Sequence, residues 1–142
     1  MSTTEQNKVI TANESFYQAI RDGDLDRMKT LWMNDDEVKC VHPGWPMLYG
    51  WDSVSQSFKS IFENGGVIGI ELFDISAQVS GEVAWVICVE KISHTFGEQV
   101  QSGYAQSTNI FIKDGGDWLL SVHHASPMPT PGTEVSSGES LQ

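Results

Sequence analysis

Two histidine motifs lie far apart in this sequence, and their side chains could share one pocket. The segment Cys40-Val-His-Pro-Gly-Trp-Pro places His42 beside a proline turn. The segment Trp118-Leu-Leu-Ser-Val-His-His-Ala-Ser-Pro places His124 on a strand. An imidazole changes charge near neutral pH, so it can accept or donate a proton in catalysis. The two motifs therefore predict a pocket in which acid/base chemistry can occur.

Each of these histidines has a structural and a functional interpretation. His42 is either a turn histidine that hydrogen-bonds the backbone near Pro43, or a general base or ligand contact whose pKa lies near neutral pH. His124 either bonds a neighbouring serine in the core or lines the pocket, and its expected inward face favours the pocket. The adjacent His123 should then point outward, toward the surface or a dimer interface.

Other polar and aromatic residues are expected on the same inner surface. Glu90 either orients an imidazole such as His124 or caps helix donors at the rim, because an unpaired buried carboxylate is costly. Asn109 is either a structural amide between strands or a group that orients the ligand. Trp45, on its Pro-Gly loop, is a candidate lid for an apolar ligand. The predicted catalytic residues are His42, His124 and Glu90, and the predicted ligand contacts are Phe16, Trp32, Trp45, Tyr49, Cys88, Ser107 and Asn109.

Metal and phosphate chemistry have little support in the sequence. The four histidines do not follow a known metal-ligand spacing, and the expected register puts His123 and His124 on opposite faces. No glycine motif that cradles phosphates is present. We therefore predict no metal site and no cofactor.

The composition indicates one globular domain. The chain has 142 residues, of which 39% are hydrophobic, and a formal net charge of -11 with only 8 lysines and arginines. Such a surface repels nucleic-acid phosphates and anionic membranes, so we predict neither as a partner. The first residues form no apolar signal segment, and we expect a cytoplasmic protein whose two cysteines are reduced.

The apolar periodicity predicts helices first and strands later. Helices are expected over residues 9–20, 25–33 and 52–64, followed by long strands within 67–126. The fold class is therefore α+β, with a curved antiparallel or mixed sheet wrapped around the N-terminal helices. Residues 1–127 form the domain. The Pro/Gly/Ser/Glu-rich residues 128–142 are expected to form a flexible tail.

The hairpin turns predict which residues share a face of the sheet. A two-residue turn at Gly115-Gly116 pairs Ser107 with His124, and a turn at Gly97-Glu98 pairs Cys88 with Ser107. Helices can cover only one face, while both faces are apolar. We therefore expect a homodimer that buries the outer-face residues Trp85, Ile87, Val89, Ile110 and Ile112.

This order of helices, His-Pro turn and long strands resembles the nuclear transport factor 2-like superfamily, and within it the SnoaL-like group. The resemblance covers residues 5–127 and rests on Gly23-Asp24-Leu25-Asp26, Val41-His42-Pro43 with Gly50, Thr108-Asn109-Ile110-Phe111, and Trp118 through Pro127. It implies a cone-shaped α+β barrel with a deep pocket between sheet and helices, commonly assembled as a dimer through the outer sheet face.

The same superfamily includes ketosteroid isomerase, and the resemblance implies roles for three residues. His42 matches the general-base aspartate, and Asn109 matches the protonated aspartate of the oxyanion hole. Phe16 matches the oxyanion tyrosine but has no hydroxyl. The implied function is binding of a small apolar organic molecule, with isomerase, dehydratase or cyclase chemistry by histidine and no cofactor. The alternative is a non-catalytic dimerisation or scaffold domain with a vestigial pocket.

Overall fold

The computed structural model describes residues 4–132, which form three helices and one six-stranded sheet. The helices are α1 (Thr4–Asp22), α2 (Leu25–Leu31) and α3 (Trp51–Asn64). The strands are β1 (Lys39–Val41), β2 (Leu48–Tyr49), β3 (Val67–Ser80), β4 (Val83–Phe96), β5 (Gln99–Asp114) and β6 (Asp117–Met128). The predicted α+β class is confirmed.

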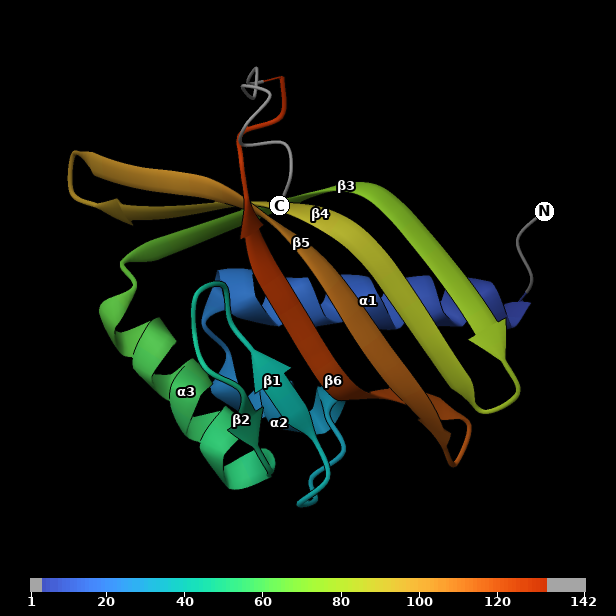
Figure 1. The fold of residues 1–142 in the computed structure, drawn as a ribbon. Coiled ribbons are helices and arrows are strands. Elements are labelled where there is room, and N and C mark those ends of the chain that lie inside the picture. The colour runs from blue at the N-terminus through green and yellow to red at the C-terminus, as the bar shows by residue number, and fades with distance from the viewer. Residues whose placement is uncertain (1–3, 133–142) are drawn as a thin grey trace.

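The sheet is curved and mixed, and the helices lie against its concave side (Figure 1). Its strand order is β2-β1-β6-β5-β4-β3. β1 runs parallel to β6, and every other neighbouring pair is antiparallel. The parallel pairing brings the His-Pro loop that follows β1 next to the histidine pair on β6, because Val41 pairs with His124.

Local sequence explains how the first two helices meet. Gly23 adopts a φ of 60°, a left-handed conformation that glycine tolerates and that ends α1. The Asp24 side chain then accepts a hydrogen bond of 3.0 Å from the backbone N–H of Arg27 and caps α2. This tight corner turns the two helices so that both pack against the sheet.

The core fills the space between the helices and the concave face. It is rich in aromatic side chains that meet edge to face, as in the pair Phe16 and Phe58, whose ring centroids are 6.0 Å apart. The largest fully buried residues include Trp32, Tyr17, Phe16, Phe58, Phe111, Met28 and Leu120. A cavity lies next to this core.

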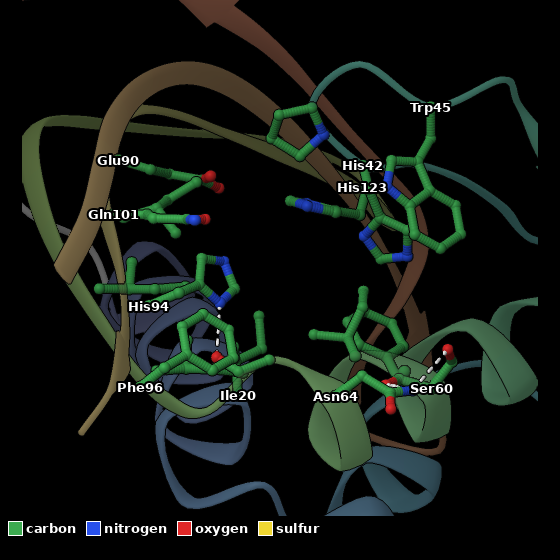
Figure 2. A pocket seen from close by; sticks show the side chains of 17 residues that line it. Ile20, His42, Trp45, Ser60, Asn64, Glu90, His94, Phe96, Gln101 and His123 are labelled. Atoms are coloured by element: carbon green, nitrogen blue, oxygen red, sulfur yellow. Dashed lines mark hydrogen bonds between the residues drawn. The ribbon is translucent and has the colours of Figure 1, made fainter. Parts of the chain in front are cut away.

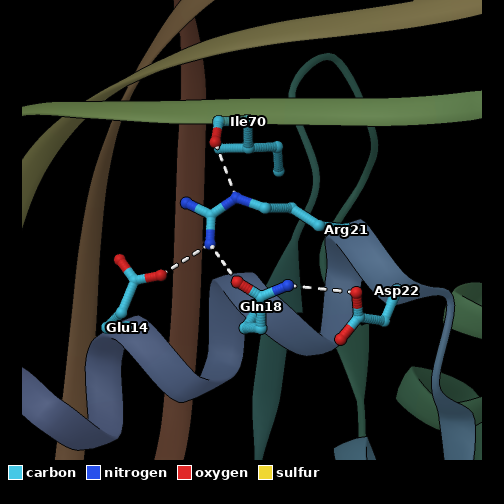
Figure 3. A network of polar contacts seen from close by, with 5 residues as sticks. All are labelled: Glu14, Gln18, Arg21, Asp22 and Ile70. Atoms are coloured by element: carbon cyan, nitrogen blue, oxygen red, sulfur yellow. Dashed lines mark hydrogen bonds and ion pairs between the residues drawn. The ribbon is translucent and has the colours of Figure 1, made fainter.

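An arginine on α1 fastens β3 to that helix (Figure 3). The Nε atom of Arg21 donates a hydrogen bond of 2.8 Å to the carbonyl oxygen of Ile70. Its Nη1 atom reaches Glu14 at 2.5 Å and Gln18 at 3.2 Å on the same helix. The guanidinium is thus held outside the cavity, while the side chain of Ile70 lines it.

The register between β5 and β6 differs from the predicted one. Phe111 pairs with Leu120 as expected, but Ile110 pairs with Val122, so Ser121 is an extra residue at a β-bulge. A shift of one residue moves every later side chain to the opposite face. His124 therefore pairs with Thr108 and is exposed on the outer face, and the prediction that it points inward is wrong. His123 points inward instead.

The outer face of β4 and β5 matches the predicted register. Val86 pairs with Asn109 and Cys88 with Ser107, which leaves Trp85, Ile87 and Ile110 on the outer face. Ile87 is 48% exposed in the single chain. The predicted tail begins at the last residue of β6, and its residues 133–142 lie outside the described part of the chain. Within the described part, no helix is long and apolar enough to cross a membrane.

Candidate functional site

A cavity of about 430 Å³ lies between α1, α3 and the concave face of the sheet. Most of its wall is apolar and comes from isoleucines and phenylalanines of the helices, β3 and β4. The titratable groups in the wall are His42, Glu90, His94 and His123. Figure 2 shows Glu90, Gln101 and His94 on one side of the open centre, with His42, His123 and Trp45 on the other. No lysine or arginine of residues 4–132 lines it.

His42 is buried at the end of β1 and has one well-formed polar contact. Its Nε2 atom lies 2.8 Å from the hydroxyl oxygen of Ser57 on α3. The hydroxyl of Ser57 itself donates to the carbonyl oxygen of Val54 at 2.7 Å. Burial lowers the pKa of His42 to about 4, so the imidazole is neutral at pH 7. The expectation that its pKa lies near neutral pH is wrong, because burial disfavours the charged ring.

His123 is the second imidazole of the cavity wall. Its Nδ1 atom lies 2.6 Å from Oδ1 of Asn109, and its ring centroid is 6.3 Å from that of His42. Phe16 packs edge-on against it at 4.9 Å between centroids. Burial and the nearby His42 and His124 lower the pKa of His123 to about 3, so this ring is also neutral.

Glu90 is a buried carboxyl group, only 2% exposed, on the opposite side of the cavity. The hydroxyl of Tyr17 donates to its Oε2 atom at 2.5 Å. Burial raises the pKa of Glu90, while the bonds from Tyr17 and Ser107 act in the other direction. The carboxyl thus pairs with a tyrosine, and the alternative in which it orients His124 is wrong because His124 is on the other face.

A polar network lies behind the cavity wall and connects these groups. Asn109 Nδ2 donates to Tyr17 Oη at 3.0 Å and to Asn13 Oδ1 at 2.8 Å. Ser107 lies 3.0 Å from the same tyrosine oxygen and 3.3 Å from the sulfur of Cys88. All five side chains are buried. The network therefore supports the wall from within and does not itself line the cavity.

The structure brings some of the predicted site residues together and separates others. His42, Glu90 and Trp45 line the cavity. Phe16 and Trp32 belong to the packed core, and Cys88, Ser107 and Asn109 belong to the network behind the wall. Tyr49 is 64% exposed on β2 and lies outside the cavity, as does His124.

Sequence reasoning missed several residues of the site. His123 was assigned outward because the bulge at Ser121 was not foreseen. Tyr17 was not predicted because the resemblance matches the oxyanion tyrosine to Phe16, whereas the next residue, Tyr17, carries the hydroxyl that reaches Glu90. His94 and Gln101 were also missed. They pair with each other near the turn of the β4–β5 hairpin, and they line the cavity because this hairpin is long enough to extend along it.

The arrangement favours proton transfer without a bound ion. Neutral imidazoles can accept protons, and a carboxyl group whose pKa is raised can donate one. Among residues 4–132 no group of three or more His, Cys, Asp or Glu could hold a metal ion. Both cysteines are buried free thiols, and burial raises the pKa of Cys40 and Cys88, which leaves them protonated and poorly nucleophilic.

The sequence matches the SnoaL-like domain family over residues 9–131, which is most of the chain. The chain belongs to the SnoaL-like domain family. A solved structure from Streptomyces avermitilis, a proposed dehydratase of the NTF2-like family, is 34% identical, with a TM-score of 0.83. That match covers 89% of this chain and 98% of the other. The predicted NTF2-like superfamily is thereby confirmed.

This SnoaL-like domain is also similar to an association domain and to an F-box protein. A proposed calcium/calmodulin-dependent protein kinase type II association domain from Thiobacillus denitrificans is 26% identical, with a TM-score of 0.74, and covers 82% of this chain and 92% of its own. The F-box protein SKIP8 of Arabidopsis thaliana is 29% identical over 84% of this chain. The chain spans only about half of that relative, 49% of its length.

Proposed function

We propose that this SnoaL-like domain binds a small, uncharged, mostly apolar organic molecule and moves a proton on it without a cofactor, as an isomerase or dehydratase does. The observation that carries the proposal is the pairing of neutral imidazoles with a carboxyl group of raised pKa across one apolar cavity. The similarity to the proposed dehydratase from Streptomyces avermitilis supports the same class of reaction.

The wall of the cavity favours an uncharged ligand. Its isoleucines and phenylalanines bind apolar surface, and His42, His123 and Glu90 provide a few polar contacts. A carboxylate or phosphate ligand would meet Glu90 and no balancing lysine or arginine among the described lining residues. Burying that unpaired charge is costly, so ketones, lactones and phenols fit the site better.

The proposed reaction assigns separate roles to His42 and Glu90. His42 accepts a proton from a carbon atom next to the carbonyl group of the ligand. Glu90 donates its proton to an oxygen atom: the carbonyl oxygen in an isomerisation, or the leaving hydroxyl in a dehydration, where the C–O bond breaks and water forms. When Glu90 gives up its proton it becomes negatively charged, and this charge raises the pKa of His42 and makes it a stronger base. In an isomerisation the protonated His42 then delivers its proton to a different carbon atom and the enol hydroxyl returns its proton to Glu90, so both groups are restored.

We also propose that two copies of the domain pair through the outer face of β4 and β5. The helices cover the concave face, whereas Ile87 on the outer face is 48% exposed. Covering Ile87, Trp85 and Ile110 with a second copy removes apolar surface from water. The proposed setting is the reducing cytoplasm, in which the buried thiols of Cys40 and Cys88 persist without oxidation.

The alternative function is a non-catalytic assembly domain with a vestigial cavity. The similarity to the Thiobacillus denitrificans association domain favours it, at 26% identity over nearly the whole of that domain. The two functions differ in whether the cavity binds a ligand. An assembly domain needs the outer sheet face and has no use for a neutral ligand held between Glu90 and His42.

A melting screen separates the two functions, because a ligand that binds only the folded protein raises the melting temperature. The panel contains uncharged ketones, lactones and polycyclic phenols, each with a carboxylate analogue. We expect stabilisation by uncharged members, loss of that stabilisation in His123→Leu, and retention in the matched control His124→Leu, which alters the outer face. If no member stabilises the protein, or if His123→Leu leaves the stabilisation intact, the cavity is not a binding site and the assembly function stands.

A further inference from the structure

Two groups on opposite sides of the cavity are joined by one buried chain of hydrogen bonds. The chain runs from His123 through Asn109 and Tyr17 to Glu90. Its two ends line the cavity, and its two middle members lie behind the wall. Asn109 and Tyr17 are both fully buried, so neither contacts a ligand directly.

The hydrogens that Asn109 donates determine the direction of its hydrogen bond with His123. Asn109 uses its Nδ2 hydrogens for Asn13 at 2.8 Å and for Tyr17 at 3.0 Å, so its Oδ1 atom is left facing His123. An amide oxygen can only accept, so the Nδ1 atom of His123 must carry the hydrogen of the 2.6 Å contact. In a neutral ring the other nitrogen, Nε2, then holds the lone pair.

The same reasoning applies at the opposite end of the chain. The single hydroxyl hydrogen of Tyr17 goes to Oε2 of Glu90 at 2.5 Å. A protonated Glu90 therefore carries its hydrogen on Oε1, since Oε2 is already an acceptor. Figure 2 shows the carboxyl of Glu90 facing the open centre of the cavity, across from His42 and His123.

We infer that Tyr17 and Asn109 are positioning residues that turn a hydrogen-bond acceptor, Nε2 of His123, and the remaining carboxyl oxygen of Glu90, Oε1, toward a ligand in the cavity. All three bonds of the chain donate in the same direction, from the histidine toward the carboxyl. These hydrogen bonds therefore fix the tautomer of His123 and also leave Oε1 as the oxygen of Glu90 that can carry a proton. The inference rests on the proposed function for the use of this site. The directions of the hydrogen bonds, however, depend only on residues of the protein.

If the hydrogen bonds donated in the opposite direction, a different ring nitrogen of His123 would carry the hydrogen. If Glu90 donated to Tyr17 and the whole series reversed, the tyrosine would donate to a flipped Asn109 amide, and Nδ1 of His123 would become the acceptor. If Tyr17 instead donated to Ser107, 3.0 Å away, the bonds of Asn109 and His123 would keep their direction. In the full reversal the hydrogen of His123 moves to its other nitrogen. Nε2 would then carry the hydrogen. The flipped amide would also place its oxygen beside Oδ1 of Asn13, which sits 2.8 Å from the present Nδ2, unless Asn13 flipped as well. The observed geometry favours the first direction.

Nitrogen NMR of the histidine rings in the ligand-free protein tests this inference without any substrate. At pH 7 we expect His123 to be a single neutral tautomer with hydrogen on Nδ1 and none on Nε2. Asn109→Asp keeps the acceptor and adds a negative charge, so it should keep that tautomer and raise the pKa of His123 by about one to three units. Asn109→Leu removes the acceptor and should give a mixture of tautomers. His94, which bonds the carbonyl oxygen of Gly65 at 2.8 Å, is the internal control and should not change.

A second variant examines the carboxyl end of the chain. Tyr17→Phe removes the hydrogen bond that lowers the pKa of Glu90, so carbon NMR of the Glu90 carboxyl should show its pKa moving upward. A wild-type His123 with hydrogen on Nε2, or a Glu90 pKa unchanged by Tyr17→Phe, would overturn the inference. Neither result depends on turnover. The experiments can therefore disprove the inferred hydrogen-bond directions without bearing on the proposed catalysis, and the two failures are distinguished.

Discussion

The Nε2 atom of His42 lies 2.8 Å from Oγ of Ser57, whose own hydroxyl hydrogen goes to the carbonyl oxygen of Val54 at 2.7 Å. Because that hydrogen is already committed, the serine oxygen can only accept from the imidazole. His42 therefore carries its hydrogen on Nε2 and its lone pair on Nδ1. A strand residue and a helix residue together prepare the proposed base before a ligand arrives.

Replacing His42 tests its proposed role as the base. We expect His42→Ala to lower turnover on the order of 100-fold or more, the usual contribution of a positioned base. Ligand affinity should change only a few-fold, because the apolar wall provides most of the binding. Steady-state kinetics and a direct binding titration on the same variant separate the two effects. Turnover that survives His42→Ala would move the chemistry to another group.

Acid should destabilise the fold through the two buried imidazoles. The pKa of His42 is lowered from 6.5 to about 4 and that of His123 from 6.5 to about 3. A lowered pKa gives stability that is present above 6.5 and is lost as the pH falls toward the folded-state value. At about 1.4 kcal/mol per pH unit, His42 alone accounts for about 3 kcal/mol between pH 7 and pH 4.

Urea unfolding at both pH values measures this loss. His42→Phe should lose about 3 kcal/mol less than the wild type between pH 7 and pH 4. The control His124→Phe, which alters an exposed residue, should keep most of the wild-type loss. Glu90 acts with the opposite sign, since its raised pKa favours the folded protein at low pH. An equal loss in the wild type and in His42→Phe would mean that the imidazole is not buried in the neutral form.

The proposed dimer is tested on its outer sheet face. Ile87→Lys places a charge in the middle of the surface that a second copy would bury, so light scattering should report a monomer for this variant and a dimer for the wild type. Fluorescence of Trp85 on the same face should shift toward that of an exposed indole. Tyr49→Lys is the matched control, because Tyr49 is 64% exposed on β2, at the far edge of the sheet. A monomeric wild type at micromolar concentration would contradict the proposal.

The general fold follows from the sequence because its signals are local. Gly23 and Asp24 mark the corner between the first helices, and alternating apolar residues such as Val86 and Cys88 mark the inner face of β4. These features depend on a few neighbouring residues, and the pairing of β4 with β5 follows from one tight turn. The predicted fold and the register of that hairpin were correct for this reason.

The details of the site depend on single-residue shifts that no local pattern reveals. One extra residue at Ser121 exchanges the faces of His123 and His124. Similarly, one position along α1 separates Phe16, which packs in the core, from Tyr17, whose hydroxyl reaches Glu90. The pKa of His42 was also misjudged, because the depth of its burial depends on Phe58 and Trp45, which pack against the ring from distant or looping segments.

Hydrogen exchange at a carbon atom of a bound ketone tests the central claim most directly. An uncharged ketone that stabilises the protein is incubated in deuterated water, and proton NMR follows the loss of signal at the carbon next to the carbonyl. The account predicts that the wild type accelerates this exchange, and that Glu90→Gln and His42→Ala each remove most of the acceleration while the ketone still binds. A ketone that binds in the cavity but exchanges no faster than in buffer, or equally fast with both variants, would contradict it.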